Sequence, residues 1–163
     1  MKLSVVYYSK TGKTKEMAEV IAAGMEKIAG IETGVFDISH MDEAFIGESR
    51  AVIVGTPTWH ANPCWQIKKF LDGSGKLKLK GKIGGAFATA DHAQGGADMA
   101  ISVILTHLMV DGMLVYSGGS ALGQPFIHLG PVALKENFEK SRDMFEIFGT
   151  RIAEKAKELF PEE

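Results

Sequence analysis

Five short apolar segments alternate with stretches of helical periodicity, and this alternation limits the folds open to the chain more than any other feature. The first segment, residues 3–8, reads LSVVYY, and residues 14–29 then place apolar side chains three or four positions apart. Strands that are apolar almost throughout are typical of a parallel sheet covered by helices on both faces. The pattern therefore predicts an α/β domain of three layers.

The same patterns predict the remaining elements. Further strands are expected at residues 33–37, 51–55, 83–88 and 113–116, the last of them open to interruption, and helices at residues 41–46, 64–71 and 97–110. After a Gly/Pro-rich stretch, a long helix is predicted to carry along one face Leu134, Phe138, Phe145, Phe148, Ile152, Ala156 and Leu159.

Five strands favour a doubly wound sheet of order 2-1-3-4-5 over a six-stranded dinucleotide-binding arrangement. Because the sequence has no internal repeat, low-complexity segment or linker, residues 1–163 are expected to form one domain. Ligands of such sheets bind beyond the carboxyl ends of the strands. The loops after the first, third and fourth strands are therefore the candidate site.

Charge and cysteine content exclude several classes of protein. A net charge of −2 argues against a strongly basic nucleic-acid binder and against a very acidic carrier. Cys64 is the only cysteine, so no intrachain disulfide can form, and a reducing cytoplasm is expected. No signal-peptide pattern and no apolar run of about 18 residues is present, so neither secretion nor a membrane span is expected.

The first loop is expected to bind an anion. It contains Ser9, Thr11, Gly12, Lys13 and Thr14, directly after a strand and at the start of a helix. The hydroxyls can donate to phosphate oxygens, Gly12 lets the backbone approach closely, and the amides of the first helical turn point outward. This indicates a phosphate site of near-neutral donors; the competing interpretation is a Ser/Thr-rich helix cap.

The motif of nucleoside-triphosphate-binding loops is a weaker alternative. Gly12-Lys13-Thr14 matches its end, but the motif needs a glycine five positions before Gly12, where this chain has Tyr7.

The second loop is rich in rigid and flat groups. Pro57 fixes a backbone angle, Thr58 can hydrogen-bond to the edge of a heteroaromatic ring, and Trp59 can cover its face. An aromatic cover of this kind suits a flavin, so we expect these residues and His60 to contact one; alternatively, Trp59 packs on the neighbouring helix.

The third loop follows the fourth strand, and its glycines give its backbone conformational freedom. Its amides are suited to the carbonyls and ring nitrogens of a flavin, with Asp91 or His92 near the rim. No His/Cys/carboxylate set with metal-ligand spacing accompanies either histidine, so no metal site is expected. The expected contacts in this loop are Thr89, Ala90, Asp91, His92, Gly95 and Gly96.

Taken together, the three loops resemble those of flavodoxin-like FMN proteins across essentially the whole chain. Ser9, Thr11, Gly12 and Thr14 match the family's [Ser/Thr]-x-Thr-Gly-x-Thr phosphate signature. The branch that looks most similar is the tryptophan-repressor-binding-protein-type NAD(P)H:quinone oxidoreductases, through residues 55–58, 70–72, 81–82 and 95–96. The resemblance implies a flavodoxin-like fold that places the FMN phosphate at residues 9–14 and the ring between the other two loops.

The resemblance also implies the chemistry. The first hypothesis is an oxidoreductase in which FMN takes electrons from NAD(P)H and passes them to a quinone-like small molecule, with no catalytic side-chain nucleophile. The alternatives are a flavodoxin-type electron carrier between redox proteins and an FMN-binding regulatory module.

Two further segments have two interpretations each. The helix at residues 97–110 has more apolar residues than one buried face requires, which indicates either self-association into a homo-oligomer or deep burial. The lysines of residues 76–82 indicate a solvated entry into a strand, or attraction of NAD(P)H phosphates or an acidic partner.

Overall fold

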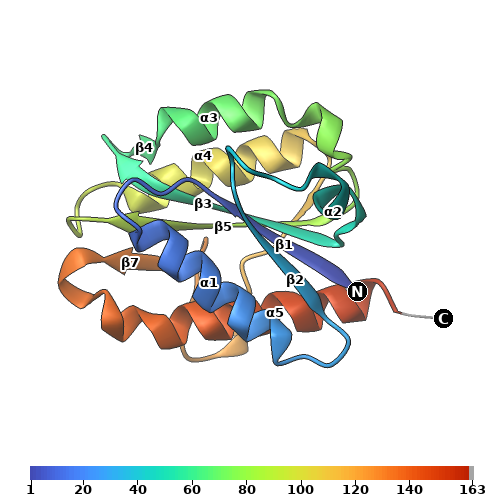
Figure 1. The fold of residues 1–163 in the computed structure, drawn as a ribbon. Coiled ribbons are helices and arrows are strands. Elements are labelled where there is room, and N and C mark those ends of the chain that lie inside the picture. Colours follow the sequence, from blue (N-terminus) through green and yellow to red (C-terminus); the bar gives the residue numbers. More distant parts are fainter. Residues whose placement is uncertain (162–163) are drawn as a thin grey trace.

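A parallel sheet forms the centre of the computed structural model, which describes residues 1–161 (Figure 1). Its main strands are β1 (Lys2–Tyr7), β2 (Glu32–Asp37), β3 (Ala51–Trp59) and β5 (Ile83–Ala90). With β6 (Leu114–Val115) at the edge, the order is β2-β1-β3-β5-β6. Since β5 and β6 are the predicted fourth and fifth strands, the predicted order 2-1-3-4-5 is confirmed, although two short strands bring the sheet to seven.

The fifth strand is interrupted. β6 pairs with the start of β5, where Ile83 faces Leu114, whereas a separate strand, β7 (Val132–Leu134), pairs with its end, where Ala88 faces Val132. The residues between β6 and β7 form a loop that includes a short 3-10 helix, η2 (Ser120–Leu122). Two separate pieces of chain therefore flank the same side of β5.

The predicted start of the last helix was wrong. Leu134 belongs to β7, and Phe138 lies between two 3-10 turns, η3 (Lys135–Asn137) and η4 (Glu139–Ser141), before α5 (Arg142–Leu159) begins. The end of β5 has backbone groups that must be paired, and residues 132–134 pair with them. Helical spacing of apolar residues alone does not reveal such a long-range pairing.

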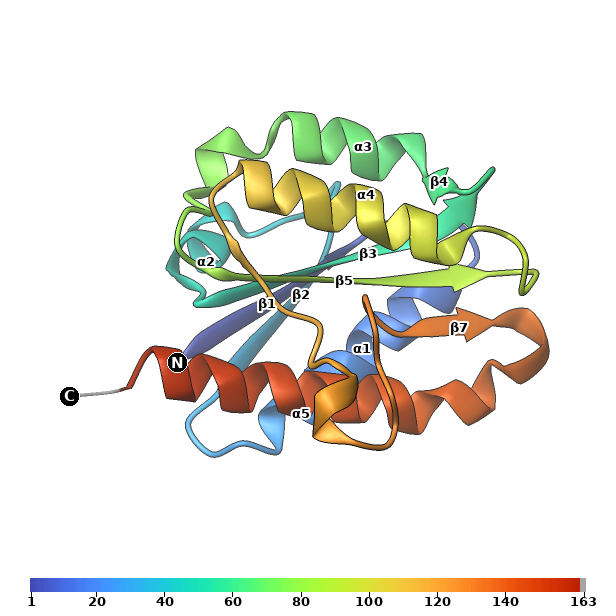
Figure 2. The ribbon, with the colours of Figure 1, turned by 180° about the vertical axis from the view of Figure 1, so that it is seen from behind.

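Helices cover both faces of the sheet. α1 (Lys13–Glu26) and α5 lie on one face, and α3 (Trp65–Asp72) and α4 (Ala97–Val110) lie on the other, as Figure 2 shows from behind. Each face has its own apolar core, one around Phe145 and Phe148 and the other around Ile101 and Ile104. A short helix, α2 (Glu43–Glu48), precedes β3. None of the helices described is long and apolar enough to cross a bilayer.

The second candidate loop, which contains Pro57 to His60, is largely a hairpin. β3 continues to Trp59 and pairs antiparallel with β4 (Asn62–Pro63) through Thr58 opposite Pro63. His60 and Ala61 make the turn at φ values of 50° and 60°. A two-residue hairpin turn with both residues at positive φ matches the twist of the strands. Glycine or asparagine usually signals this turn, and neither occupies these two positions.

The lysine run is only partly solvated. It forms the 3-10 helix η1 (Ser74–Leu77) and the entry into β5, and Lys76 pairs with Glu43. Lys82, in contrast, is buried, and its Nζ donates to the carbonyls of Ile46 and Gly47 at 2.6 and 2.8 Å. Burial lowers the pKa of Lys82. Lys82 therefore holds α2 to the sheet and is not available to a ligand.

Two glycines let α1 and α5 approach closely. A Cβ at Gly24 would lie 2.0 Å from the Glu146 carbonyl oxygen, and one at Gly149 would lie 2.0 Å from that of Ile21. Each helix thus packs directly on the other's backbone, which fixes α1 on its face of the sheet.

We predict that Gly24→Ala destabilises the protein by about 2 kcal/mol, because the added methyl forces two packed helices apart. The measurement is the midpoint of urea unfolding. The control is Gly47→Ala in α2, where a Cβ would meet nothing within 4 Å and a helical alanine is favoured over glycine by about 0.5–1 kcal/mol. Equal midpoints for wild type and Gly24→Ala would contradict this account of the helix contact.

Candidate cofactor site

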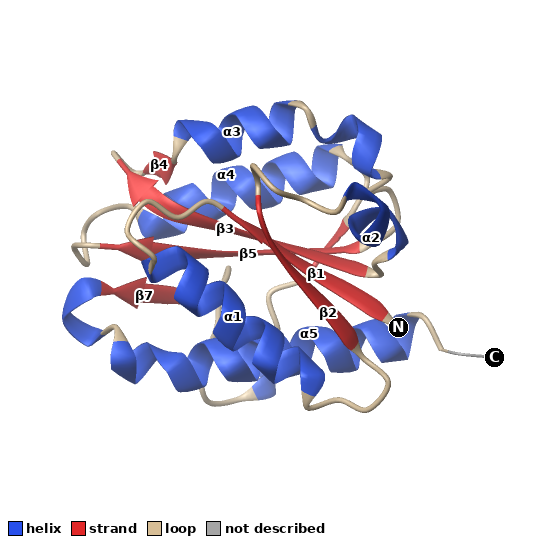
Figure 3. Ribbon diagram, viewed as in Figure 1, coloured by secondary structure: helices blue, strands red, loops and turns tan. Residues whose placement is uncertain are grey.

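The loops that follow β1, β3 and β5 meet at one edge of the sheet, on the left of Figure 3. Parallel pairing brings them together: Tyr7 faces Gly55, and Pro57 faces Thr89. A cavity of about 500 Å³ lies there, within the size range of small-molecule and cofactor sites. It is lined by Lys10, Thr11, Lys13, Thr14, Pro57, Thr58, Trp59, Thr89, Ala90, Asp91, Ala133, Lys135 and Phe138.

The start of α1 has the features of an anion site. Gly12 precedes the helix at a φ of 91°, and no side chain caps the helix. The Ser9 Oγ accepts from the Gly12 amide at 3.1 Å, which folds the loop before the helix. The first-turn amides have no partners within a helix, so they remain available to an anion.

A hydroxyl pair joins the first and third loops. Thr14 and Thr89 are both buried, and their Oγ1 atoms lie 2.9 Å apart in a hydrogen bond. Thr14 was expected to donate to a phosphate, but in this structure its hydroxyl also connects α1 to the end of β5. The two loops are thereby held at a fixed separation.

Thr58 has a buried polar atom without a partner. Its Oγ1 is one of only two buried side-chain N or O atoms in residues 1–161 that make no hydrogen bond, and Thr58 lines the cavity. The neighbouring Thr56 differs, because its hydroxyl donates to the Pro57 carbonyl at 2.8 Å and accepts from the Cys64 amide at 3.0 Å. An unpaired buried hydroxyl costs about 1–3 kcal/mol, so a bound molecule that pairs with Thr58 recovers that free energy.

Trp59 packs on the first loop rather than only on the adjacent helix. Its ring meets that of Tyr8 edge-on, with centroids 6.2 Å apart, and Lys10 Nζ lies 5.8 Å from its centroid. Trp59 is half-buried and lines the cavity. The indole thus forms one wall of the cavity, supported from the side.

Only the first part of the third loop lines the cavity. Thr89, Ala90 and Asp91 line the cavity, whereas His92 is exposed and its carbonyl accepts from the Gly95 amide at 3.0 Å. A Cβ at Gly96 would lie 2.3 Å from the Ala61 Cβ, so this glycine lets the hairpin tip rest on the start of α4. Nine of the fifteen predicted site residues line the cavity, and six do not: Ser9, Gly12, His60, His92, Gly95 and Gly96.

The analysis of the sequence missed one segment of this site. Ala133, Lys135 and Phe138 line the cavity from β7 and the turns after it. Lys13 Nζ lies 3.9 Å from the centre of the Phe138 ring, a cation–π contact. These residues were assigned to a long helix, and only the pairing of β7 with β5 brings them to the cavity. The helical spacing of the apolar residues in this segment gave no indication of a strand.

Cys64 is a buried thiol at the start of α3. It is fully shielded from solvent, and burial raises its pKa. Because nucleophilic cysteines are thiolates, this environment does not favour a reactive cysteine. The site therefore offers hydrogen-bond donors, lysines and a flat aromatic wall, but no activated side-chain nucleophile at Cys64.

Comparison with known proteins finds flavodoxins and NAD(P)H dehydrogenases (quinone) among the relatives of this chain. The family model described as Flavodoxin matches residues 5–102. A flavodoxin of Clostridium saccharobutylicum is 47% identical over 160 residues, which cover 98% of this chain and 100% of that protein. An NAD(P)H dehydrogenase (quinone) of Aromatoleum aromaticum is 29% identical over 164 residues, covering 83% of this chain and 76% of the relative.

Solved structures agree with the fold. The crystal structure of the flavodoxin, WrbA-like protein from Agrobacterium tumefaciens superposes with a TM-score of 0.78 at 27% identity, covering 96% of this chain and 98% of the other.

Proposed function

This chain belongs to the flavodoxin family, and from that premise we propose that it binds FMN in the loop cavity and carries electrons between redox proteins. The flavodoxin of Clostridium saccharobutylicum aligns along its full length at 47% identity. The quinone dehydrogenase of Aromatoleum aromaticum is more distant, and about a quarter of its length has no counterpart here, since the alignment covers 76% of it. These relations favour the carrier over the NAD(P)H-dependent oxidoreductase that the sequence motifs suggested first.

The observation that supports an FMN site most directly is the match between the cavity's unfilled hydrogen-bonding capacity and the two ends of FMN. At one end, the start of α1 presents amides that no side chain caps. At the other, the buried Thr58 hydroxyl lacks a partner. A phosphate satisfies the first and a polar ring edge satisfies the second.

Each loop has a distinct role in this proposal. Ser9, Thr11, Gly12, Lys13 and Thr14 hold the phosphate, Ser9 by shaping the loop and the others through hydroxyl, amide or ammonium donors. The ring lies between the second and third loops, flanked by the residues named above from Pro57 to Trp59 and from Thr89 to Asp91.

The remaining predicted residues act at the rim or from behind. We propose that His60 and His92 lie at the exposed rim, and that Gly95 and Gly96 shape the loop on which the hairpin rests. FMN supplies the electron-transfer chemistry when bound, while the protein shields one part of it and leaves another accessible to a partner.

The carrier and the enzyme differ in their reaction with NAD(P)H. We expect the FMN-loaded protein to oxidise NADH and NADPH no faster than free FMN does, and to exchange electrons rapidly with a redox-protein donor. Stopped-flow absorbance measures both rates. Rapid NAD(P)H oxidation coupled to stoichiometric quinone reduction would establish the oxidoreductase instead.

Thr58→Val separates cofactor binding from stability. We predict that it stabilises the FMN-free protein by about 1 kcal/mol, because an unpaired hydroxyl is removed, and weakens FMN binding about tenfold. Unfolding midpoints and fluorescence titration of FMN measure the two effects.

Thr56→Val is the matched control. The Thr56 hydroxyl of the wild type both donates and accepts a hydrogen bond within the chain. We therefore expect Thr56→Val to destabilise the FMN-free protein. FMN affinity of Thr58→Val equal to wild type would exclude Thr58 as a cofactor contact.

Lys13→Met tests the charge of the phosphate site. Lys10, Lys13 and Lys135 line the cavity, and a hydrogen bond to a charged group contributes about 1.5–3 kcal/mol. We predict that the substitution raises the Kd for FMN at least about tenfold at low salt and flattens its salt dependence.

Lys15→Met serves as the control for this change, because Lys15 occupies the same helical turn as Lys13 but does not line the cavity. Its Nζ lies 3.7 Å from Glu19 Oε1 in an ion pair. If both variants show the wild-type salt dependence, the phosphate is held by neutral donors alone.

A further inference from the structure

A second cavity lies between α3 and the loop that follows β2. Ile38 and Met41 of that loop form one wall, and Phe70 of α3 and Leu77 of η1 form the opposite side. Its volume is about 350 Å³, at the lower end of the range for small-molecule sites. No residue of the described chain lines both this cavity and the cofactor cavity, so the two sites are distinct.

One residue of this cavity has a buried acceptor without a partner. Gln66 of α3 lines the cavity. Its Oε1 and the Thr58 Oγ1 are the two buried side-chain N or O atoms of residues 1–161 that make no hydrogen bond. An acceptor that is shielded from water and left unpaired is costly, because nothing replaces its lost hydrogen bond to solvent. Gln66 therefore favours a ligand that brings an N–H or O–H donor into the cavity.

An unpaired cation lies close to this amide on α3. Lys69 lines the cavity, and within residues 1–161 its ammonium group makes no ion pair or hydrogen bond. The other lysine of the cavity, Lys76, already pairs with Glu43. Residues three apart on a helix are neighbours, with Cβ atoms about 5–6 Å apart. The Gln66 acceptor and the Lys69 cation can thus meet two groups of one small molecule.

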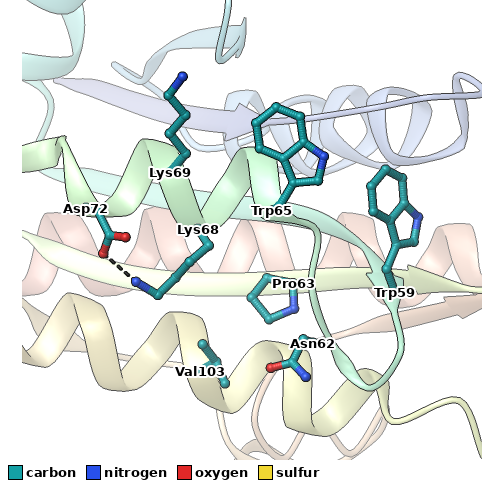
Figure 4. A pocket seen from close by; sticks show the side chains of 8 residues that line it. All are labelled: Trp59, Asn62, Pro63, Trp65, Lys68, Lys69, Asp72 and Val103. Carbon is teal, nitrogen blue, oxygen red and sulfur yellow. Dashed lines mark hydrogen bonds and ion pairs between the residues drawn. The ribbon is translucent and has the colours of Figure 1, made fainter.

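A large exposed aromatic ring borders the cavity beside this cation. Trp65 lines the cavity and is 63% exposed. Figure 4 shows Trp65 and Lys69 projecting from one side of α3, with the Lys68–Asp72 ion pair on the other. An indole at the edge of an apolar cavity offers a face on which a flat ring stacks. Trp65 and Lys69 also line a groove beside α4, whose other residues include Trp59, Pro63 and Val103.

We propose that the cavity between α3 and the β2 loop binds a small aromatic acid that carries an N–H or O–H donor. The ring packs among the apolar side chains and against Trp65, the donor meets Gln66 Oε1, and the carboxylate meets Lys69 Nζ. A hydrogen bond between ammonium and carboxylate is charge-assisted and therefore stronger than a neutral one. A fatty acid is a poorer occupant because it has no donor for Gln66, and an apolar side chain of a docking protein satisfies neither polar group.

Isothermal titration calorimetry of the full chain with FMN in excess tests the proposal. Excess FMN keeps the probes out of the cofactor cavity. The probes are para-hydroxybenzoate and indoleacetate, each of which has a ring, a donor and a carboxylate. We expect saturable binding at low salt with a Kd below about 1 mM, which is an ordinary affinity for ligands of this size.

Two variants remove the two polar contacts. Gln66→Leu is expected to raise the Kd of para-hydroxybenzoate about fivefold, because the acceptor is lost. Lys69→Met is expected to raise it at least about tenfold at low salt, because the cation is lost. Benzoate, which lacks the donor, and phenol, which lacks the carboxylate, should show the same losses with the wild type. Gln66→Leu removes an unpaired buried group, so we expect it to fold, which circular dichroism verifies.

Lys68→Met is the matched control, because Lys68 lies on the other side of α3 and does not line the cavity. Its Kd for para-hydroxybenzoate should equal that of the wild type. Absence of saturable binding of both probes overturns the proposal. It is also overturned if phenol binds as tightly as para-hydroxybenzoate, if neither Gln66→Leu nor Lys69→Met weakens binding, or if the control weakens it equally.

Discussion

The parallel pairing of β1, β3 and β5 is the constraint on which the rest of the structure depends. It places the carboxyl ends of three strands side by side, so that three loops far apart in sequence share one cavity. The hydrogen bond between Thr14 and Thr89 then joins two of these loops across the sheet edge. Close packing at Gly24 and Gly149 holds α1, and therefore the uncapped helix start, in its position. The site is thus a product of backbone topology before any ligand binds.

The electrostatic character of the cavity differs from that of a purely neutral phosphate cradle. Three lysines line it, and Asp91 is the only carboxylate among its lining residues. The whole chain nevertheless has a net charge of −2. The lysines are not placed at random, because Lys13 rests on the Phe138 ring and Lys10 lies over Trp59. Aromatic rings thus hold two ammonium groups at the cavity, which lowers the cost of ordering these flexible side chains.

Local patterns predicted much of this structure, and the misses have a common physical cause. The helix predicted at residues 97–110 has the same bounds as α4, and the order of the sheet followed from the alternation of strands and helices. The position of β7 was missed because it depends on pairing with the end of β5. Phe138 and Lys135 were lost from the site with it. The hairpin turn was missed because His60 and Ala61 adopt positive φ without glycine, supported by packing on Gly96.

That packing links the cofactor cavity to the outer layer of the protein. Gly96 directly precedes α4, and its contact with Ala61 positions the hairpin whose strand carries Trp59. Trp59 in turn lines both the cavity and the groove beside α4. Side chains in a close-packed interior transmit displacements because there is little free volume to absorb them. The packing of the hairpin against the start of α4 therefore helps to fix the position of Trp59, and with it one wall of the cavity.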